Sequence, residues 1–129
     1  MKKLSKNIIT VMVTGLWVNG SEFFRNEVLL KPYWTEHYRK LGLIFPSDAV
    51  NGIVWMIWGF MFAFIMFILS QKYSLLATIL ISWLVGFVLM WLVLWNLLVL
   101  PDGLLLYAIP LSFLEAFIGA ILCKKIPVL

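Results

Sequence analysis

The segment LLLYAIPLSFLEAFIGAILC, from Leu104 to Cys123, decides the fold class of this chain. A helix that crosses a bilayer takes about 20 apolar residues, and this segment has that length with one charged residue, Glu115, near its middle. A lone ionised carboxylate in hydrocarbon costs several kcal/mol. We therefore expect a membrane helix whose Glu115 is protonated, paired or hydrated and faces other protein groups.

The remaining composition predicts that most of the chain lies in the membrane. Hydrophobic residues make up 64% of it and charged residues 12%, whereas soluble domains have about 25% charged residues. Apolar runs at about 7–30, 49–70, 74–100 and 103–123 each suffice for a span. The sequence thus predicts one all-α domain, residues 1–129, folded as an integral membrane bundle of four transmembrane helices.

Basic residues predict the orientation of these helices. Positive charge is enriched on the cytoplasmic side of membrane proteins. If four helices alternate, one side receives six lysines and the other three basic residues, or four if Arg25 near that boundary is counted, so we expect both termini in the cytoplasm. The two groups are Lys2, Lys3, Lys6, Lys72, Lys124 and Lys125 against Lys31, Arg39 and Lys40. The alternative is a signal peptide, with basic Lys2–Lys3, an apolar run and a cleavage site at 18–20.

The first span carries an unusual polar face. Gly15, Asn19, Glu22 and Asn26 recur at helical spacing, and Arg25 follows Glu22 by three residues. Together with Asn96, near the outer end of the third span, the polar residues from 19 to 26 are expected to form an outward-facing cluster. Two interpretations stay open: a polar seam that docks the helix onto its neighbours, or the lining of a pathway or pocket.

Depth arithmetic predicts that Arg25 does not pair with Glu115. At about 1.5 Å per residue, Arg25 lies about 28 Å from the level of Lys6, and Glu115 about 14 Å from the level of Lys124. If both lysines mark the same boundary and both helices are straight, the gap is about 15 Å. An arginine side chain does not cover that distance.

Glu115 is then expected to lie among hydroxyl groups at its own depth, from Thr14, Ser82 and Ser112, and to be neutral at pH 7. The Trp83 N–H could donate to its carboxyl group, or the ring could face lipid. A buried acid of this kind is either structural or able to bind and release protons, and the sequence leaves both open.

Small residues predict how the helices pack, because they let backbones approach closely. A stripe at every fourth residue runs along the fourth span, and a similar stripe runs along the second, so these two helices are expected to be neighbours or oligomer contacts. The residues concerned are Gly52, Gly59, Ala63, Ala108, Ala116, Gly119 and Ala120.

The polar connection between the first two spans predicts a short interfacial helix over 32–41. In a helix, Tyr33, Trp34, His37 and Tyr38 share one side and charged residues the other, as in a helix that lies flat on a membrane. His37 is the only histidine and is interpreted as a polar edge, because a metal site needs further ligands.

No enzymatic signature, metal-ligand spacing or phosphate-binding glycine loop is present in the sequence, and the one cysteine excludes an internal disulfide. We expect no enzyme, cofactor, metal or nucleic-acid partner, since the net charge of +4 is explained by lysines at anionic headgroups. The preferred function is a non-catalytic accessory subunit that packs against other membrane subunits or its own copies. The alternative is a small oligomeric proton-coupled transporter or channel using Glu22, Arg25 and Glu115.

The pairs Leu16-Trp17, Phe23-Phe24 and Tyr33-Trp34, placed before a second span, give the first third of the chain a resemblance to small four-helix bacterial membrane proteins. The resemblance implies a bacterial inner-membrane location and carries no activity with it.

Overall fold

The computed structural model describes residues 2–129, and the described chain is entirely helical apart from turns and loops. The N-terminal helix α1 continues without a break into a π-helical segment, η1, and is followed by a short helix, α2. Two more hydrophobic rods follow: α3, then α4 joined through the π-helical segment η2 to α5. The last rod is α6, ending in a 3-10 turn, η3. The bounds are α1 Lys3–Phe23, η1 Phe24–Leu29, α2 Lys31–Lys40, α3 Ala49–Lys72, α4 Leu75–Trp83, η2 Leu84–Val88, α5 Leu89–Asn96, α6 Leu105–Lys125 and η3 Ile126–Val128.

Local sequence signals explain where the rods begin. At α3, the Asp48 side chain accepts from the backbone at Asn51, whose own side chain accepts from the Asp48 backbone, which is a reciprocal capping box. At α4, the Ser74 hydroxyl oxygen accepts from the backbone N–H of Ala77 at 3.2 Å. The turn before α6 contains Gly103, whose φ of 76° is a left-handed conformation that glycine adopts without strain.

A lysine from the last helix closes the end of α3. The Lys124 ammonium group donates to the backbone carbonyls of Ser70 and Tyr73. These carbonyls have no partner within the helix, and a cation at a helix C-terminus is electrostatically favourable. The contact brings the ends of α3 and α6 together, so Lys72 and Lys124 lie at the same end of the bundle, as the orientation analysis assumed.

Three helical rods are long and apolar enough to cross a membrane: Ala49–Lys72, Leu75–Asn96 and Leu105–Val128. Their outer faces carry exposed leucine, isoleucine, valine and phenylalanine side chains, as lipid-facing helices do. The prediction of a helical membrane protein is confirmed to this extent. The N-terminal rod, α1 with η1, is as long as the others but is not among these three.

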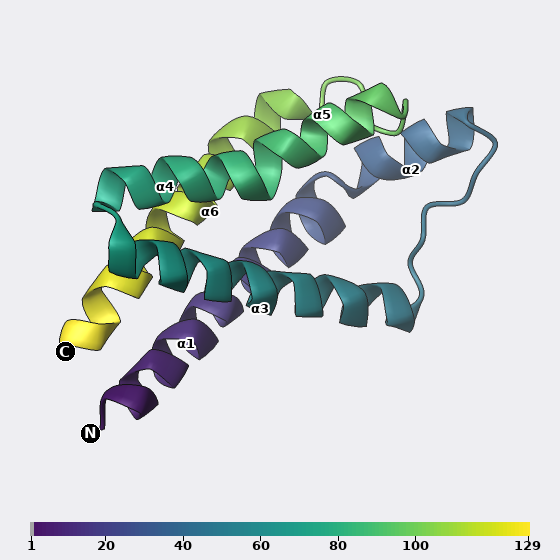
Figure 1. Ribbon diagram of the computed structural model, residues 1–129. Helices are drawn as coiled ribbons and strands as arrows, with labels where there is room; N and C mark the ends of the chain where they lie inside the picture. Colours follow the sequence, from purple (N-terminus) through teal and green to yellow (C-terminus); the bar gives the residue numbers. More distant parts are fainter. Residues whose placement is uncertain (1) are drawn as a thin grey trace.

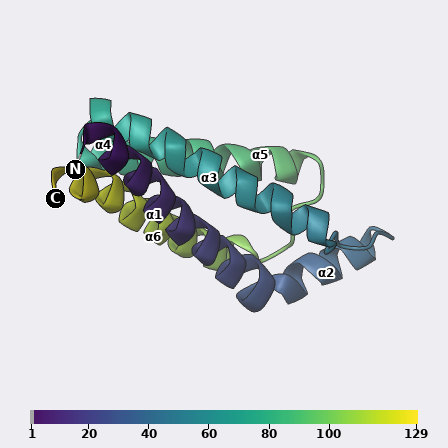
Figure 2. The ribbon, with the colours of Figure 1, turned by 90° about the horizontal axis from the view of Figure 1, so that it is seen from below.

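Figures 1 and 2 show α1 lying along α6 and crossing α3, with both chain termini at one end and α2 at the other. An aromatic cluster fills the space between α3 and the η2–α5 rod. Trp58 stacks on Phe62 at 5.2 Å between ring centroids, Phe62 meets Phe87 edge-on at 5.5 Å, and Phe87 contacts Trp91 at 6.1 Å. Such pairs add to the free energy that burial of the rings supplies.

Small residues lie at the helix contacts, as predicted, with one exception. A Cβ added at Gly59 would meet the Asn19 side chain of α1 at 2.5 Å, and one at Gly119 would meet Met66 of α3 at 2.7 Å. The second contact makes α3 and α6 neighbours. Buried small residues on these faces also include Ala63, Ala108, Ala116 and Ala120. Gly52 is exposed with nothing within 4 Å of an added Cβ, so it packs against no part of the described chain.

The segment predicted at 32–41 forms the helix α2, with the two-sided pattern expected. Its aromatic side is half-buried by other parts of the protein: Tyr33 packs on Tyr107, while Trp34 and Tyr38 pack on Phe45. The His37 ring forms a 2.8 Å hydrogen bond with the backbone carbonyl of Leu98. The residues expected to meet the membrane surface thus contact protein groups.

Candidate functional site

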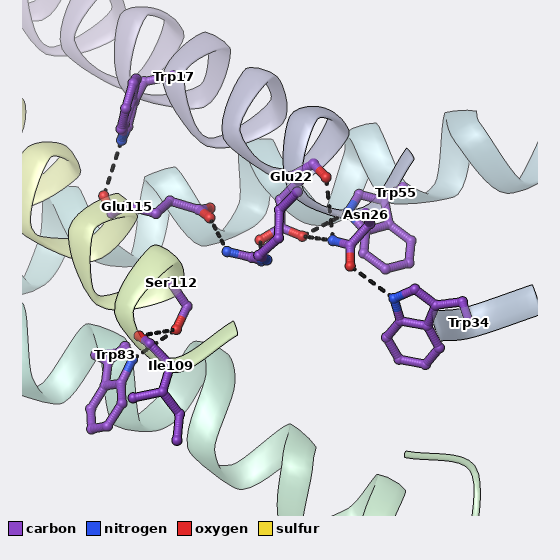
Figure 3. A network of polar contacts seen from close by, with 10 residues as sticks. Trp17, Glu22, Asn26, Trp34, Trp55, Trp83, Ile109, Ser112 and Glu115 are labelled. Carbon is purple, nitrogen blue, oxygen red and sulfur yellow. Dashed lines mark hydrogen bonds and ion pairs between the residues drawn. The ribbon is translucent and has the colours of Figure 1, made fainter. Parts of the chain in front are cut away.

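One arginine pairs with two carboxyl groups from opposite ends of the sequence. Arg25, in η1, donates through Nη2 to Glu22 Oε1 and through Nη1 to Glu115 Oε2, the latter at 2.9 Å. Glu22 lies one turn earlier on α1 and Glu115 lies on α6. We call Glu22, Arg25 and Glu115 the ion triad. Glu22 and Glu115 point toward each other from α1 and α6 (Figure 3), and both carboxyl groups pair with the guanidinium group of Arg25.

The ion triad is removed from solvent. Relative exposure is 2% for Glu22, 5% for Arg25 and 1% for Glu115. On its other side the guanidinium lies over the ring of Phe87, 5.1 Å from the centroid, a cation–π contact. Arg25 and Phe87 both belong to π-helical segments, η1 and η2. Such segments occur often at functional sites because they break the regular helical register.

Polar side chains hold Glu22 from the side away from Arg25. Its Oε2 accepts from Asn26 Nδ2 at 3.0 Å and from Trp55 Nε1 at 3.2 Å. Asn26 in turn accepts from Trp34 Nε1 at 3.1 Å, which links α2 to the site. The chain of donors from Trp34 to Glu22 is visible in Figure 3. Every oxygen of Glu22 therefore has a partner.

Glu115 is less completely bonded. Its Oε1 is a buried oxygen that accepts no hydrogen bond from residues 2–129. If both glutamates of the ion triad are ionised, one positive charge faces two negative charges, and the net charge of −1 lies in a medium that disfavours it. No other ion pair of residues 2–129 involves these side chains. The site is therefore short of one positive charge.

The prediction that Arg25 cannot reach Glu115 is wrong, because Lys6 and Lys124 do not mark a common level. Thr14 of α1 lies 3.5 Å from the sulfur of Cys123. Arg25 lies eleven residues after Thr14, or about 16 Å along the first rod, and Glu115 lies eight residues before Cys123, or about 12 Å along α6. The difference of about 4 Å is within the reach of the two side chains. The N-terminal rod extends further beyond the end of α6 than the lysines suggested.

The expected hydroxyl environment of Glu115 is also wrong. Thr14 contacts Cys123, Ser112 accepts from Trp83 Nε1 at 3.0 Å and donates to the Ile109 carbonyl, and the Ser82 hydroxyl is buried without a partner. None of the three forms a hydrogen bond with the Glu115 carboxyl group. Arg25 supplies a cation at the depth of Glu115 that the predicted environment did not include, and the neutrality of Glu115 stays a prediction.

Two asparagines differ from the predicted cluster as well. Asn96 is exposed at the end of α5 and forms no hydrogen bond with the ion triad or Asn26. Asn19 donates to the carbonyls of Gly15 at 2.9 Å and Met56 at 3.4 Å, so it ties α1 to α3 next to Gly59. Asn19 thus contacts α3, while Glu22 and Asn26 belong to the network around Arg25, and both interpretations of the polar face of α1 stay predictions.

Sequence reasoning missed three aromatic contributors to the site. Trp17 Nε1 donates to the backbone carbonyl of Glu115 at 3.0 Å, Trp55 bonds Glu22, and Phe87 covers Arg25. The available signal was that a tryptophan N–H within a membrane needs an acceptor. For Trp17 and Trp55, the acceptors lie on other helices.

A cavity of about 440 Å³ adjoins the ion triad between α1, α3 and the loop before α3. We call it the α1–α3 cavity. Glu22 is its link to the triad, and no lysine, arginine or histidine lines it. Its polar lining residues include Asn19, Glu22, Asn26, Glu27, Asp48 and Asn51. Within the described residues, no cluster of three metal-binding side chains is found.

Comparison of the chain with protein-family models, curated proteins and solved structures gave no match.

Proposed function

We propose that this protein is a small, non-enzymatic membrane transporter in which the ion triad binds and releases a proton. The observation that carries the proposal is the pairing of two buried carboxyl groups with one guanidinium group. A second positive charge in the site balances the excess carboxylate, and a proton is the smallest ion that supplies it. The unpartnered Oε1 of Glu115 can receive it.

The groups around the ion triad favour a balancing proton that is bound and released, because no fixed positive charge of the described chain other than Arg25 faces the two glutamates. The groups that face it are the Trp55 N–H from α3, the Asn26 amide from η1 and the Phe87 ring from η2, none of which titrates near neutral pH. The proton balance of the site therefore depends on Glu22 and Glu115 alone. Arg25 stays paired with whichever glutamate is ionised. The α1–α3 cavity supplies a route from the surface to Glu22.

Proton transport requires the ion triad to lie within the membrane, and we propose four spans with both termini in the cytoplasm. The N-terminal rod, residues 3–29, is about 40 Å long, enough for a bilayer core of about 30 Å. Both termini lie at the same end, which suits an even number of crossings (Figure 1). The lysines near both termini and Lys72 suit a cytoplasmic surface there. The membrane proposed is a bacterial inner membrane.

Reconstituted liposomes test the proposal. We expect the wild-type chain to dissipate an imposed pH gradient, followed with a pH-sensitive dye inside the vesicles, and Glu115→Gln and Glu22→Gln to lose most of this flux. Glu36→Gln is the matched control. Arg39 donates to Glu36 at 2.7 and 2.9 Å and holds the pKa of that carboxyl group below its usual value. This glutamate thus stays ionised and takes no part in proton exchange. Equal flux for wild type, Glu115→Gln and empty vesicles would refute the proposal.

An accessory subunit is the second candidate function, and Gly52 is the observation that favours it. This glycine of α3 has open space where its neighbour Gly59 meets α1. A helix of another subunit or a second copy can approach closely at such a position. Under this proposal the ion triad only fixes α1 against α6. A native mass in mild detergent greater than that of one chain, together with unchanged proton flux in Glu115→Gln, would favour the subunit over the transporter.

A further inference from the structure

We propose that the α1–α3 cavity binds a small organic monocation, an ammonium ion with an aromatic or alkyl body, in exchange for the proton of the ion triad. The inference rests on the proposed transport function and specifies its substrate class. Three properties of the cavity support it: the sign of its charge, the aromatic rings in its wall and its contact with the ion triad.

The charge of the cavity wall is negative. Its ionisable lining groups are Glu22, Glu27 and Asp48. Lys31 pairs with Glu27 at 2.7 Å, while Asp48 pairs with backbone groups at the start of α3 and with no cation. Glu22 shares its only cation with Glu115. The wall and the ion triad together thus have two carboxylates in excess of their cations, which attracts a positive ligand.

The apolar part of the wall favours an organic cation over a metal ion. The rings of Phe23, Phe45 and Trp55 line the cavity, and aromatic faces attract ammonium groups. Divalent metal ions prefer a shell of oxygen ligands instead. The volume of about 440 Å³ is that of a small-molecule site. An aromatic or alkyl body can pack on the rings while the ammonium group lies near Glu22.

Contact with Glu22 couples the cavity to the proton. A cation beside Glu22 supplies the positive charge that the proton otherwise supplies, so the ion triad no longer needs the proton for its charge balance. The proton leaves to water as the cation binds, and the total charge of the site is conserved. By linkage, a bound proton weakens cation binding by the same factor by which a bound cation weakens proton binding. Acidification should therefore lower the affinity for the cation.

Binding of benzyltrimethylammonium to the full-length protein in mild detergent tests the inference. Isothermal titration calorimetry, repeated in two buffers of different ionisation enthalpy, gives both the affinity and the number of protons released. We expect saturable binding with release of a proton, weakened by acid. Benzenesulfonate, an aromatic ion of opposite charge, should not bind.

Two variants locate the site and one serves as control. Glu22→Gln should weaken binding at least about tenfold and abolish proton release, because it removes the carboxylate shared with the ion triad. Asp48→Asn should weaken binding less, by about threefold, since asparagine keeps the helix cap and removes only a peripheral charge. Asp48 lies outside the ion triad, so this variant remains informative if Glu22→Gln does not fold. Glu36→Gln, on the exposed side of α2, should bind as wild type does.

The outcomes separate the two proposals. Absence of benzyltrimethylammonium binding, equal binding of benzenesulfonate, or unchanged affinity in both cavity variants overturns the substrate assignment, whatever the proton flux. Binding without proton release overturns the exchange. If the cation binds with proton release but wild-type liposomes carry no proton flux in its presence, the cation site stands and the transport function fails.

Discussion

Removal of the Arg25 side chain should destabilise the protein strongly, because it leaves two carboxyl groups buried without a cation. The side chains of Arg25, Glu22 and Glu115 are 6%, 2% and 1% exposed. Loss of one partner from a buried ion pair costs about 3–5 kcal/mol. We expect Arg25→Gln to lower the free energy of unfolding by an amount in this range at neutral pH.

The assay is equilibrium unfolding by SDS in mixed micelles, followed by circular dichroism. The control is Lys31→Gln, which breaks the partly exposed Lys31–Glu27 pair and should cost about 0.2–1 kcal/mol. Adding Glu115→Gln to Arg25→Gln should raise the free energy of unfolding again by about 0.5–3 kcal/mol, because one of the two unpaired negative charges is removed. If Arg25→Gln costs no more than the control, or the second substitution adds to the loss, the ion triad does not have the energetic role assigned to it.

Three further predictions concern packing, a buried donor and a helix start. Gly59→Ala should lower the free energy of unfolding by about 1–3 kcal/mol, since its Cβ would lie 2.5 Å from the Asn19 side chain of α1. Gly52→Ala should leave stability unchanged or raise it. Equal effects of the two substitutions in SDS unfolding would contradict the contact between α1 and α3. Trp83→Phe should lose about 0.5–1.5 kcal/mol of stability with its hydrogen bond, and Trp95→Phe, at a ring 70% exposed, should not. Asp48→Ala should cost about 0.5–2 kcal/mol by removing the cap of α3, measurable as a lower unfolding midpoint, whereas Asp48→Asn should show little change.

Hydropathy and helix signals predicted the helical rods well, because both depend on neighbouring residues. The predicted start of the second span, residue 49, is the first residue of α3, and Tyr33, Trp34, His37 and Tyr38 share the half-buried side of α2 as their spacing indicated. The second rod ends at Lys72 and the third at Asn96, within a few residues of the predicted bounds. The π-helical turns inside the first and third rods had no sequence signal that hydropathy could detect.

The charged residues of the candidate site were selected from the sequence, but their connections were not. Glu22, Arg25, Asn26 and Glu115 were all selected, since polar groups in apolar helices must find partners. Which partners they find depends on how far one helix is displaced along another, and the sequence contains no direct record of that displacement. The lysines gave a false common level, which separated Arg25 from Glu115 and assigned hydroxyl partners to the acid.

The π-helical turn of η1 has a consequence for length changes in this part of the chain. The Leu30 N–H donates to the Arg25 carbonyl, five residues back, at 2.8 Å, so this turn holds one residue more than a regular helical turn. Deleting a single residue from Phe24–Leu29 would let the rod continue as an ordinary helix. Because the wide turn already accommodates the extra residue, the residues after such a deletion, α2 included, would keep roughly their present direction, whereas a deletion from the regular part of the rod would turn them by about 100°. The segment Phe24–Leu29 should thus tolerate the loss of one residue other than Arg25 better than the regular helix α1 does.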